Sequence, residues 1–197
     1  MKYLRPALVS LLLFSVITGL AYPMLITGLA QVLFPAQANG SLVEVDGKVV
    51  GSKLIGQEFT RPGYFWGRIS AAVDPNDKDK HQYFGLASGG TNLGPTNPAL
   101  TDEVKGRIAD LKKYPTPAGP VPVDLVTASA SGLDPHITPA AALYQVPRVA
   151  AARHIDPAQL QALVTQNTQG PAVGLLGEER VNVLALNMAL DKLKALP

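Results

Sequence analysis

Residues 7–34 read ALVSLLLFSVITGLAYPMLITGLAQVLF, a run of 28 residues without a charged side chain. Lys2 and Arg5 precede the run, and the next charged residue is Glu44. About 20 helical residues cross the hydrocarbon core of a bilayer, so this run is long enough to span a membrane. We therefore predict a transmembrane helix over residues 7–34.

The basic residues before the run predict its orientation. The positive-inside rule keeps Lys2 and Arg5 in the cytoplasm and sends the rest of the chain to the other side of the inner membrane. No second apolar run of spanning length follows. The predicted order is a cytoplasmic N-terminus (residues 1–6), the transmembrane helix, a membrane exit (residues 35–40) and one extracytoplasmic, periplasmic domain (residues 41–197).

A cleaved signal peptide is the alternative reading of this N-terminus. Ala36, Gln37 and Ala38 fit the small-x-small rule for a cleavage site. The apolar body of a signal peptide is about 7–15 residues long, and this run is nearly twice that length. The length favours a retained helix, and both readings place the domain outside the cytoplasm.

The apolar run also contains residues that a plain anchor does not need. Ser15 and Gly19 form a small-xxx-small pair, which lets two helix backbones approach closely. Pro23 removes a backbone hydrogen bond near the middle of the span and predicts a kink. We interpret Ser15, Gly19 and Pro23 as a surface that packs against partner helices, although small residues and proline are also ordinary in membrane helices.

The composition limits the classes of function. The chain has 197 residues, a net charge of +2 and no cysteine, so disulfides and zinc–thiolate sites are excluded. A charge this small, with no basic arm, argues against binding of nucleic acid. The soluble part is long enough for one domain with its own core.

The pattern after the membrane run predicts an α+β domain, with a small N-terminal sheet followed by several helices. Valines around Asp46-Gly47 predict a β-hairpin over residues 41–50, which residues 52–59 extend. Another strand is predicted over residues 121–128, and the glycine-rich residues 86–98 are predicted to form an ordered loop. Three predicted helices begin at a cap: one at Thr101 with an apolar stripe to Leu111, one at Thr138-Pro139 that runs to about Arg153 with Pro147 as a kink, and one at Asp156-Pro157 that runs to about Gln166. An apolar stripe predicts a last helix from near Asn182 to Leu196.

The sequence contains few groupings of reactive side chains. Ser129 or Ser131 with Asp134 and His136 would suit a serine hydrolase, but catalytic triads are built from distant segments and no G-x-S-x-G motif is present. The more economical interpretation of Asp134-Pro135-His136 is a turn before a helix. The three histidines, His81, His136 and His154, would form a metal site only if folding brought them together.

Gln145 and Arg148 are three residues apart and therefore share one face of a predicted helix, with Arg153 about one turn further on. A guanidinium can hold a phosphate or carboxylate through two hydrogen bonds. The alternative is that Arg148 pairs with an acidic side chain of the domain or caps the segment around Asp134.

Motifs along nearly the whole chain resemble the C-subunit family of the Kdp potassium-transporting ATPases. The motifs that carry the resemblance are Gly19–Pro23, Gln37–Leu42, Gly51–Gln57, Tyr64–Arg68, Ser88–Pro98, Asp124–Thr138, Tyr144-Gln145, Arg148–Ala150 and Val181–Leu184.

The resemblance implies a non-catalytic, single-pass subunit that a high-affinity potassium uptake complex requires for assembly and activity. The implied partners are a potassium-conducting membrane subunit, a P-type ATPase subunit that hydrolyses ATP, a small membrane peptide and the lipid bilayer. The resemblance further implies that the chain acts as a catalytic chaperone that raises the affinity of the ATPase subunit for ATP, with Gln145 and Arg148 as nucleotide contacts. No tightly bound cofactor is expected. An independent membrane-anchored hydrolase or binding module is the alternative function.

Overall fold

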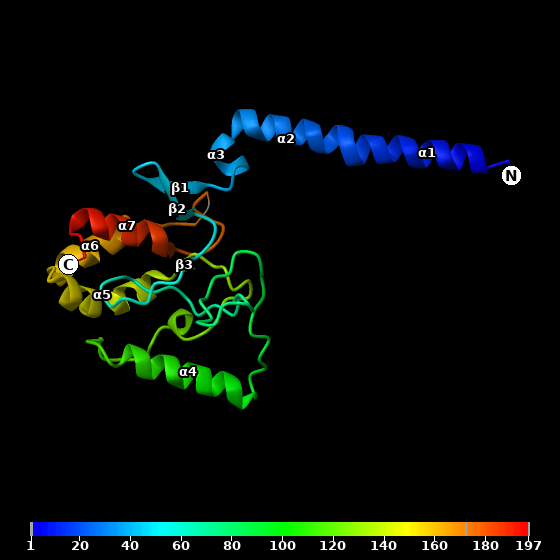
Figure 1. Cartoon of the computed structure of the whole chain (residues 1–197). Coiled ribbons are helices and arrows are strands. Elements are labelled where there is room, and N and C mark those ends of the chain that lie inside the picture. Colours follow the sequence, from blue (N-terminus) through cyan, green and yellow to red (C-terminus); the bar gives the residue numbers. More distant parts are fainter. Residues whose placement is uncertain (1, 172, 197) are drawn as a thin grey trace. The chain divides into compact units, whose positions relative to one another are not determined.

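The computed structural model describes residues 2–171 and 173–196, and it divides the chain into two compact units, Met1–Ser52 and Lys53–Pro197 (Figure 1). Helices and short strands occur in both units, so the mixed α and β class predicted from the sequence is confirmed. The two units are described separately below.

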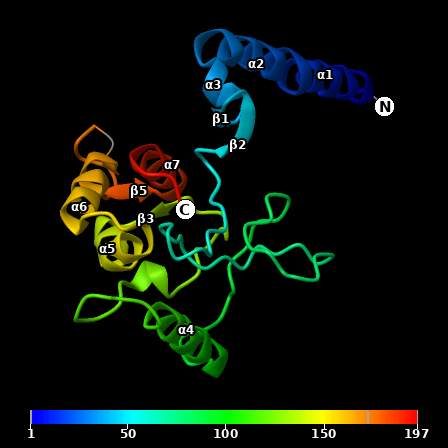
Figure 2. The ribbon, with the colours of Figure 1, turned by 60° about the vertical axis from the view of Figure 1, so that its left-hand side comes forward.

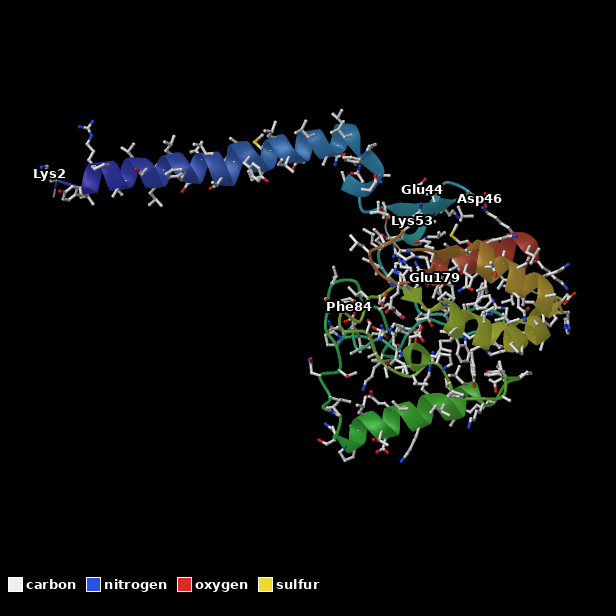
Figure 3. All side chains as sticks on the ribbon, turned by 180° about the vertical axis from the view of Figure 1, so that it is seen from behind. Lys2, Glu44, Asp46, Lys53, Phe84 and Glu179 are labelled. Atoms are coloured by element: carbon white, nitrogen blue, oxygen red, sulfur yellow. The ribbon has the colours of Figure 1, made fainter. Side chains whose placement is uncertain are left out.

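The first unit begins with the predicted apolar helix. Helix α1 (Leu4–Val16) continues through a π-helical turn, η1 (Ile17–Ala21), into α2 (Tyr22–Leu33). Together they form a 30-residue helix, Leu4–Leu33, that is long and apolar enough to cross a membrane, and none of its residues is buried. Its side chains point outward on all sides (Figure 3), as expected of a helix that meets lipid or partner helices.

The π-helical turn lies directly before Pro23. The backbone N–H of Tyr22 donates to the carbonyl of Ile17, five residues earlier, and Pro23 has no N–H to donate. A proline at this point therefore shifts the hydrogen-bond register from α to π over one turn. The kink predicted at Pro23 stays a prediction, and what the structure has directly before this proline is the π-helical turn.

The apolar helix ends in an ordered turn. At Phe34 the backbone leaves the helical region, and α3 (Pro35–Ala38) follows at once. The side chains of Asn39 and Gln31 hydrogen-bond to each other, with 3.0 Å from Asn39 Nδ2 to Gln31 Oε1. The exit segment predicted over residues 35–40 thus contains one short helix.

The hairpin predicted around Asp46-Gly47 is confirmed. Strands β1 (Leu42–Val45) and β2 (Lys48–Ser52) pair antiparallel. Asp46 and Gly47 both have positive φ, 50° and 74°, as a type I′ turn requires. The predicted extension by residues 52–59 is wrong, because the sheet contains these two strands only and the chain after Ser52 leaves the ladder as irregular backbone.

Within its described residues, the second unit contains four α-helices and a three-stranded sheet of very short strands. The helices are α4 (Pro98–Leu111), α5 (Pro139–Arg153), α6 (Pro157–Gln166) and α7 (Val183–Leu193), and a 3₁₀ turn, η2 (Val123–Leu125), precedes α5. Strands β3 (His136–Ile137), β5 (Arg180–Asn182) and β4 (Thr168–Gln169) pair antiparallel in that spatial order. Residues 53–97 form no helix or strand and run as long loops past the helices (Figure 2).

Local capping signals set where most helices begin. Thr138 and Asp156 cap α5 and α6, accepting from Ala141 N and Ala158 N as the sequence predicted. The predicted cap at Thr101 is wrong. Asn97 caps α4 instead, followed by Pro98 at the first helical position, and Thr101 lies inside the helix.

The strand predicted over residues 121–128 is also wrong. Its middle forms the 3₁₀ turn η2, and Thr127 Oγ1 donates back to the carbonyl of Val123. Only Ala128 pairs as a strand would, in a single bridge to Ile69. The side chain of Asp124 accepts a hydrogen bond from Thr138 N at the start of α5.

The core lies between α5, α6, α7 and the segment that contains Phe65 and Trp66. Its buried side chains come from all of these elements and also from the end of α4 and from η2, and they include Phe65, Trp66, Leu111, Leu125, Tyr144, Leu160, Leu186 and Leu190. The aromatic residues Phe65 and Trp66 therefore contribute to the main core, with Phe65 fully buried. Val104 and Ile108 of α4 pack against the same core, as their spacing predicted.

Candidate functional site

The backbone of residues 62–66 crosses the core without pairing to a strand. Amide side chains from two helices take the place of a neighbouring strand. Gln145 of α5 accepts from Trp66 N at 2.8 Å and donates to Trp66 O at 3.0 Å. Asn187 of α7 does the same for Phe65, at 2.8 and 2.9 Å. Each amide thus satisfies one buried N–H and one buried C=O, as a strand partner would.

Two buried arginines bind the remaining carbonyls of this segment. Arg148 of α5 donates to the carbonyls of Pro62 and Tyr64, at 2.6 and 2.9 Å. Arg153 donates to the carbonyl of Gly63 at 2.6 Å. We call Gln145, Arg148, Arg153 and Asn187 the backbone clamp, because all four side chains bind the main chain of residues 62–66.

The two arginines of the clamp also make contacts other than those to the main chain of residues 62–66. Arg148 also donates to Gln145 Oε1 at 2.5 Å, and its guanidinium lies 3.9 Å from the centroid of the Trp66 ring. Arg153 is fully buried and also donates to Asp191 and to the carbonyl of Lys194, at 2.7 and 2.6 Å. Such charge-assisted bonds make the desolvation of a guanidinium tolerable.

The predicted pair Gln145 and Arg148 does lie on one helix face, and its members contact each other. The expectation that Arg148 pairs with an acidic side chain or caps the segment around Asp134 is wrong, because its hydrogen-bond partners among the described residues are two carbonyls and the Gln145 amide. Burial, and then the nearby charge of Arg107, lower the pKa of Arg148 to about 9, so the guanidinium stays charged at neutral pH. Both side chains are almost fully buried, Gln145 with 1 % and Arg148 with 2 % of its surface exposed.

A small cavity of about 170 Å³ opens on the α4 side of Trp66. Its lining includes Trp66, Arg68, Tyr83, Arg107 and Tyr114. The Arg107 guanidinium lies 5.1 Å from the centroid of the Trp66 ring, and the ring of Tyr114 meets Trp66 edge-on at 5.8 Å. The cavity is smaller than the 300–1,000 Å³ typical of small-molecule sites.

Polar contacts around this cavity hold its wall in place. Tyr83 donates its hydroxyl to the carbonyl of Arg68 at 2.7 Å, and burial, with the nearby charge of Asp134, raises the pKa of Tyr83 to about 12. Arg68 in turn pairs with Asp134 at 3.4 Å. Burial by itself raises the pKa of Asp134, but hydrogen bonds from the His136 ring and backbone, together with the charge of Arg68, lower it overall.

The hydrolase grouping is not assembled in the part of the chain that the structure describes. Neither Ser129 nor Ser131 hydrogen-bonds His136; the hydroxyl of Ser131 accepts from Leu133 N instead. Asp134 accepts from the backbone N–H of His136 at 3.0 Å. The segment is therefore a turn before β3, as the simpler interpretation predicted.

The three histidines lie in different surroundings. His136 lies beside Asp134, His154 ends α5 in the left-handed conformation, and His81 contacts Asp77 at 2.6 Å. His81, Asp77 and Asp79 place their ligand atoms within 4.8 Å of one another, but the group is at the surface. Hydrogen bonding to His81 lowers the pKa of Asp77, and the same bond raises that of His81, which accounts for the grouping as an ion pair within a loop.

The predicted packing residues of the membrane helix are exposed. Ser15 lies in α1, Gly19 in the π-helical turn and Pro23 in the first turn of α2. A side chain added at Gly19 would meet no atom within 4 Å, so the glycine leaves open space beside the helix. Thr18 next to it bonds its own helix, donating to Phe14 O at 2.7 Å.

Sequence reasoning missed Asn187 and the role of Arg153. Asn187 lies four residues after Val183 and three before Leu190, inside the apolar stripe of the last helix. A polar residue at a core position requires a buried partner, so this interruption was a usable signal. Arg153 gave no comparable signal, because basic residues are common in the last turn of a helix.

Comparison with known proteins matches nearly the whole length of the chain. The family model of KdpC, described as the c chain of K+-transporting ATPase, matches residues 4–192. The KdpC subunit of the potassium-transporting ATPase of Polaromonas naphthalenivorans is 59 % identical over 97 % of this chain and 95 % of its own length. The corresponding subunits of Burkholderia cenocepacia and Bradyrhizobium diazoefficiens are each 57 % identical, over 98 and 99 % of this chain and 97 and 99 % of their own lengths.

Proposed function

This chain belongs to the KdpC family, the c chain of K+-transporting ATPases, and we propose that it is the non-catalytic accessory subunit that its potassium pump requires for assembly and activity. In this proposal a P-type ATPase subunit hydrolyses ATP and a separate membrane subunit conducts potassium. A small membrane peptide completes the complex. The observation that carries the proposal is the exposed apolar helix Leu4–Leu33, with its small residues.

The helix supports docking as well as anchoring. Gly19 leaves open space on a helix whose other residues are mostly large and apolar, and the small side chain of Ser15 lies one turn before it. Close approach of backbones is a main source of helix association in lipid, where the hydrophobic effect between helices is absent. Packing of a partner helix at Ser15 and Gly19 would therefore hold the subunit in the complex.

Gly19→Leu and Ser15→Leu test this role. Either change should reduce copurification of the chain with the other pump subunits while leaving its membrane insertion unchanged, since both positions are exposed on the helix and leucine is apolar. Gly28→Leu is the matched control, because that glycine also has no neighbour within 4 Å. Normal copurification of the Gly19→Leu and Ser15→Leu chains would show that the helix serves only as a membrane anchor.

The requirement for transport is tested by deletion. A strain that relies on this pump alone should fail to grow at micromolar potassium without the chain, and growth should return when the chain is supplied from a plasmid. Normal growth of the deletion strain would remove the proposal and favour an independent hydrolase or binding module.

We place the domain on the periplasmic side of the inner membrane. The basis is the positive charge of Lys2 and Arg5 before the helix. Because the chain has no cysteine, Lys78→Cys in an exposed loop gives a single labelling site. A membrane-impermeant maleimide should label this cysteine in cells whose outer membrane alone is permeable. Labelling only after the inner membrane is broken would show that the domain lies in the cytoplasm and would contradict this orientation.

Nucleotide contact through Gln145 and Arg148, with a chaperone-like effect on ATP affinity, stays a prediction from the family resemblance. A nucleotide would reach Arg148 only if the guanidinium left the carbonyls of Pro62 and Tyr64. Arg148→Lys keeps the charge and loses the fork of donors. If Arg148 contacts ATP, the assembled pump with Arg148→Lys should bind ATP more weakly than the wild-type pump. The affinity is measured with a labelled nucleotide at equal amounts of intact complex. An unchanged affinity would limit Arg148 to the backbone clamp.

A further inference from the structure

The loop between β4 and β5 presents apolar side chains outward. Val173, Leu175 and Leu176 have 90, 87 and 69 % of their surface exposed, although each is large and apolar. Leu86 and Val123 of the same unit are also exposed, but each stands alone, whereas these three come from one loop. A cluster of exposed apolar residues on one loop typically marks a surface that another molecule covers.

The backbone of the loop holds these side chains in one turn. Gly174 and Gly177 have positive φ, 75° and 94°, which suits glycine. Val173 also has positive φ, 53°, a conformation that a β-branched residue rarely adopts. The strain at Val173 indicates that the turn is selected for a purpose other than local stability.

Charge next to the loop narrows the choice of partner. Glu178 and Glu179 follow directly; both are exposed and neither has an ion-pair partner within the described parts of the chain (Figure 3 labels Glu179). Anionic lipid would repel these carboxylates, and residues 168–180 contain one basic residue, Arg180, against the two glutamates, so this segment carries a net negative charge. A twofold contact between two copies through this loop would bring its own carboxylates close together.

We propose that the loop Val173–Glu179 is a docking element for another subunit of the same K+-transporting ATPase. The receiving surface is an apolar recess that takes Leu175 and Leu176, with basic side chains on its rim facing Glu178 and Glu179. The inference rests on the proposed function, because it requires a multi-subunit pump. It adds a contact outside the membrane helix, and its residues are independent of the Ser15 and Gly19 face.

The test uses the full chain expressed together with the other pump subunits and purified through a tag on the chain. The double variant Leu175→Ser/Leu176→Ser should lower the recovery of partner subunits about tenfold or more, since burial of a single leucine contributes a factor of about ten to binding. Leu86→Ser is the matched control, because Leu86 is 89 % exposed and lies outside the loop. It should leave recovery unchanged.

A photoreactive benzoylphenylalanine at position 175 identifies the occupant. Crosslinking to another pump subunit supports the proposal, and the same group at position 86 should not crosslink there. Crosslinks only to lipid, only to a second copy of the chain, or to nothing would overturn it, as would full recovery of the double variant. Because the wild-type chain is purified in parallel, its own failure to bring down pump subunits would instead overturn the proposed function.

Discussion

Replacing Gln145 with leucine tests whether the backbone clamp stabilises the domain. The change keeps the volume of the side chain and removes every hydrogen bond it makes. The backbone N–H and C=O of Trp66 then lose their partners in a buried position, and Arg148 loses one acceptor. Among the described residues, the Gln145 amide makes one hydrogen bond besides these three, a longer one to the carbonyl of Ala141 at 3.3 Å.

The size of the effect follows from the number of groups left unpaired. Each buried polar group without a partner costs about 1–3 kcal/mol, so two backbone groups predict a loss of about 2–6 kcal/mol in the free energy of unfolding. A domain is stable by only about 5–15 kcal/mol, so the loss is a large share of the total. Gln145→Glu keeps the acceptor for Trp66 N and Arg148 but cannot donate to Trp66 O, so it should have an intermediate cost of about 1–3 kcal/mol.

The measurement is guanidinium unfolding of the full chain in detergent micelles, followed by tryptophan fluorescence. Trp66 is the only tryptophan, so the signal reports directly on the clamped segment. Gln159→Leu is the matched control, because Gln159 is exposed on α6. A loss below about 1 kcal/mol for Gln145→Leu, equal to that of the control, would refute the reasoning, because such a value is below the cost of even one unpaired group.

Three further predictions use the same assay. Arg153→Met leaves two carbonyls and Asp191 without their buried partner and should cost about 3–5 kcal/mol; a cost under 1 kcal/mol would contradict it. Gly132→Ala should destabilise by about 1–3 kcal/mol, because φ is 69° there and the new Cβ would lie 2.7 Å from the carbonyl of Gly89, whereas Gly94→Ala meets no atom within 4 Å and should be near neutral. The pKa of Tyr83 rises from 10.0 to about 12 on folding, so its contribution is full below pH 10 and is lost as pH rises toward 12. The free energy of unfolding of the wild type should therefore fall by about 2 kcal/mol between pH 10 and pH 12. The Tyr83→Phe variant should not show this part of the decrease.

The clamp explains how a domain with so little regular sheet keeps a defined core. Its three-stranded sheet is built from strands of two or three residues, and in the described residues the segment at residues 62–66 is not part of that sheet. Without cysteine the fold cannot use a disulfide to fix that segment. Bidentate amides and guanidiniums from α5 and α7 satisfy its backbone groups, and the adjacent Phe65 and Trp66 side chains fill the core.

The sequence by itself determined the features that depend on neighbouring residues. The uncharged run predicted the long apolar helix, Asp46-Gly47 predicted the hairpin, and Thr138-Pro139 and Asp156-Pro157 predicted where two helices begin. Each of these is set within a few residues, through hydropathy, positive φ or an N-cap hydrogen bond. Local signals failed at Thr101, where Asn97 with Pro98 is the stronger cap, and over residues 121–128, where contacts to distant segments override strand propensity.

Only the tertiary structure decided what the polar residues of the last helices do. Gln145 meets Trp66 across 79 residues of sequence and Asn187 meets Phe65 across 122. The helical spacing of Gln145 and Arg148 showed that they share a face, but it carried no information on what lies opposite that face. The packing of whole helices around the core determines which residues so far apart in sequence become hydrogen-bond partners. For that reason Gln145 and Arg148, whose spacing suggested a phosphate-binding pair, instead bind the backbone of residues 62–66.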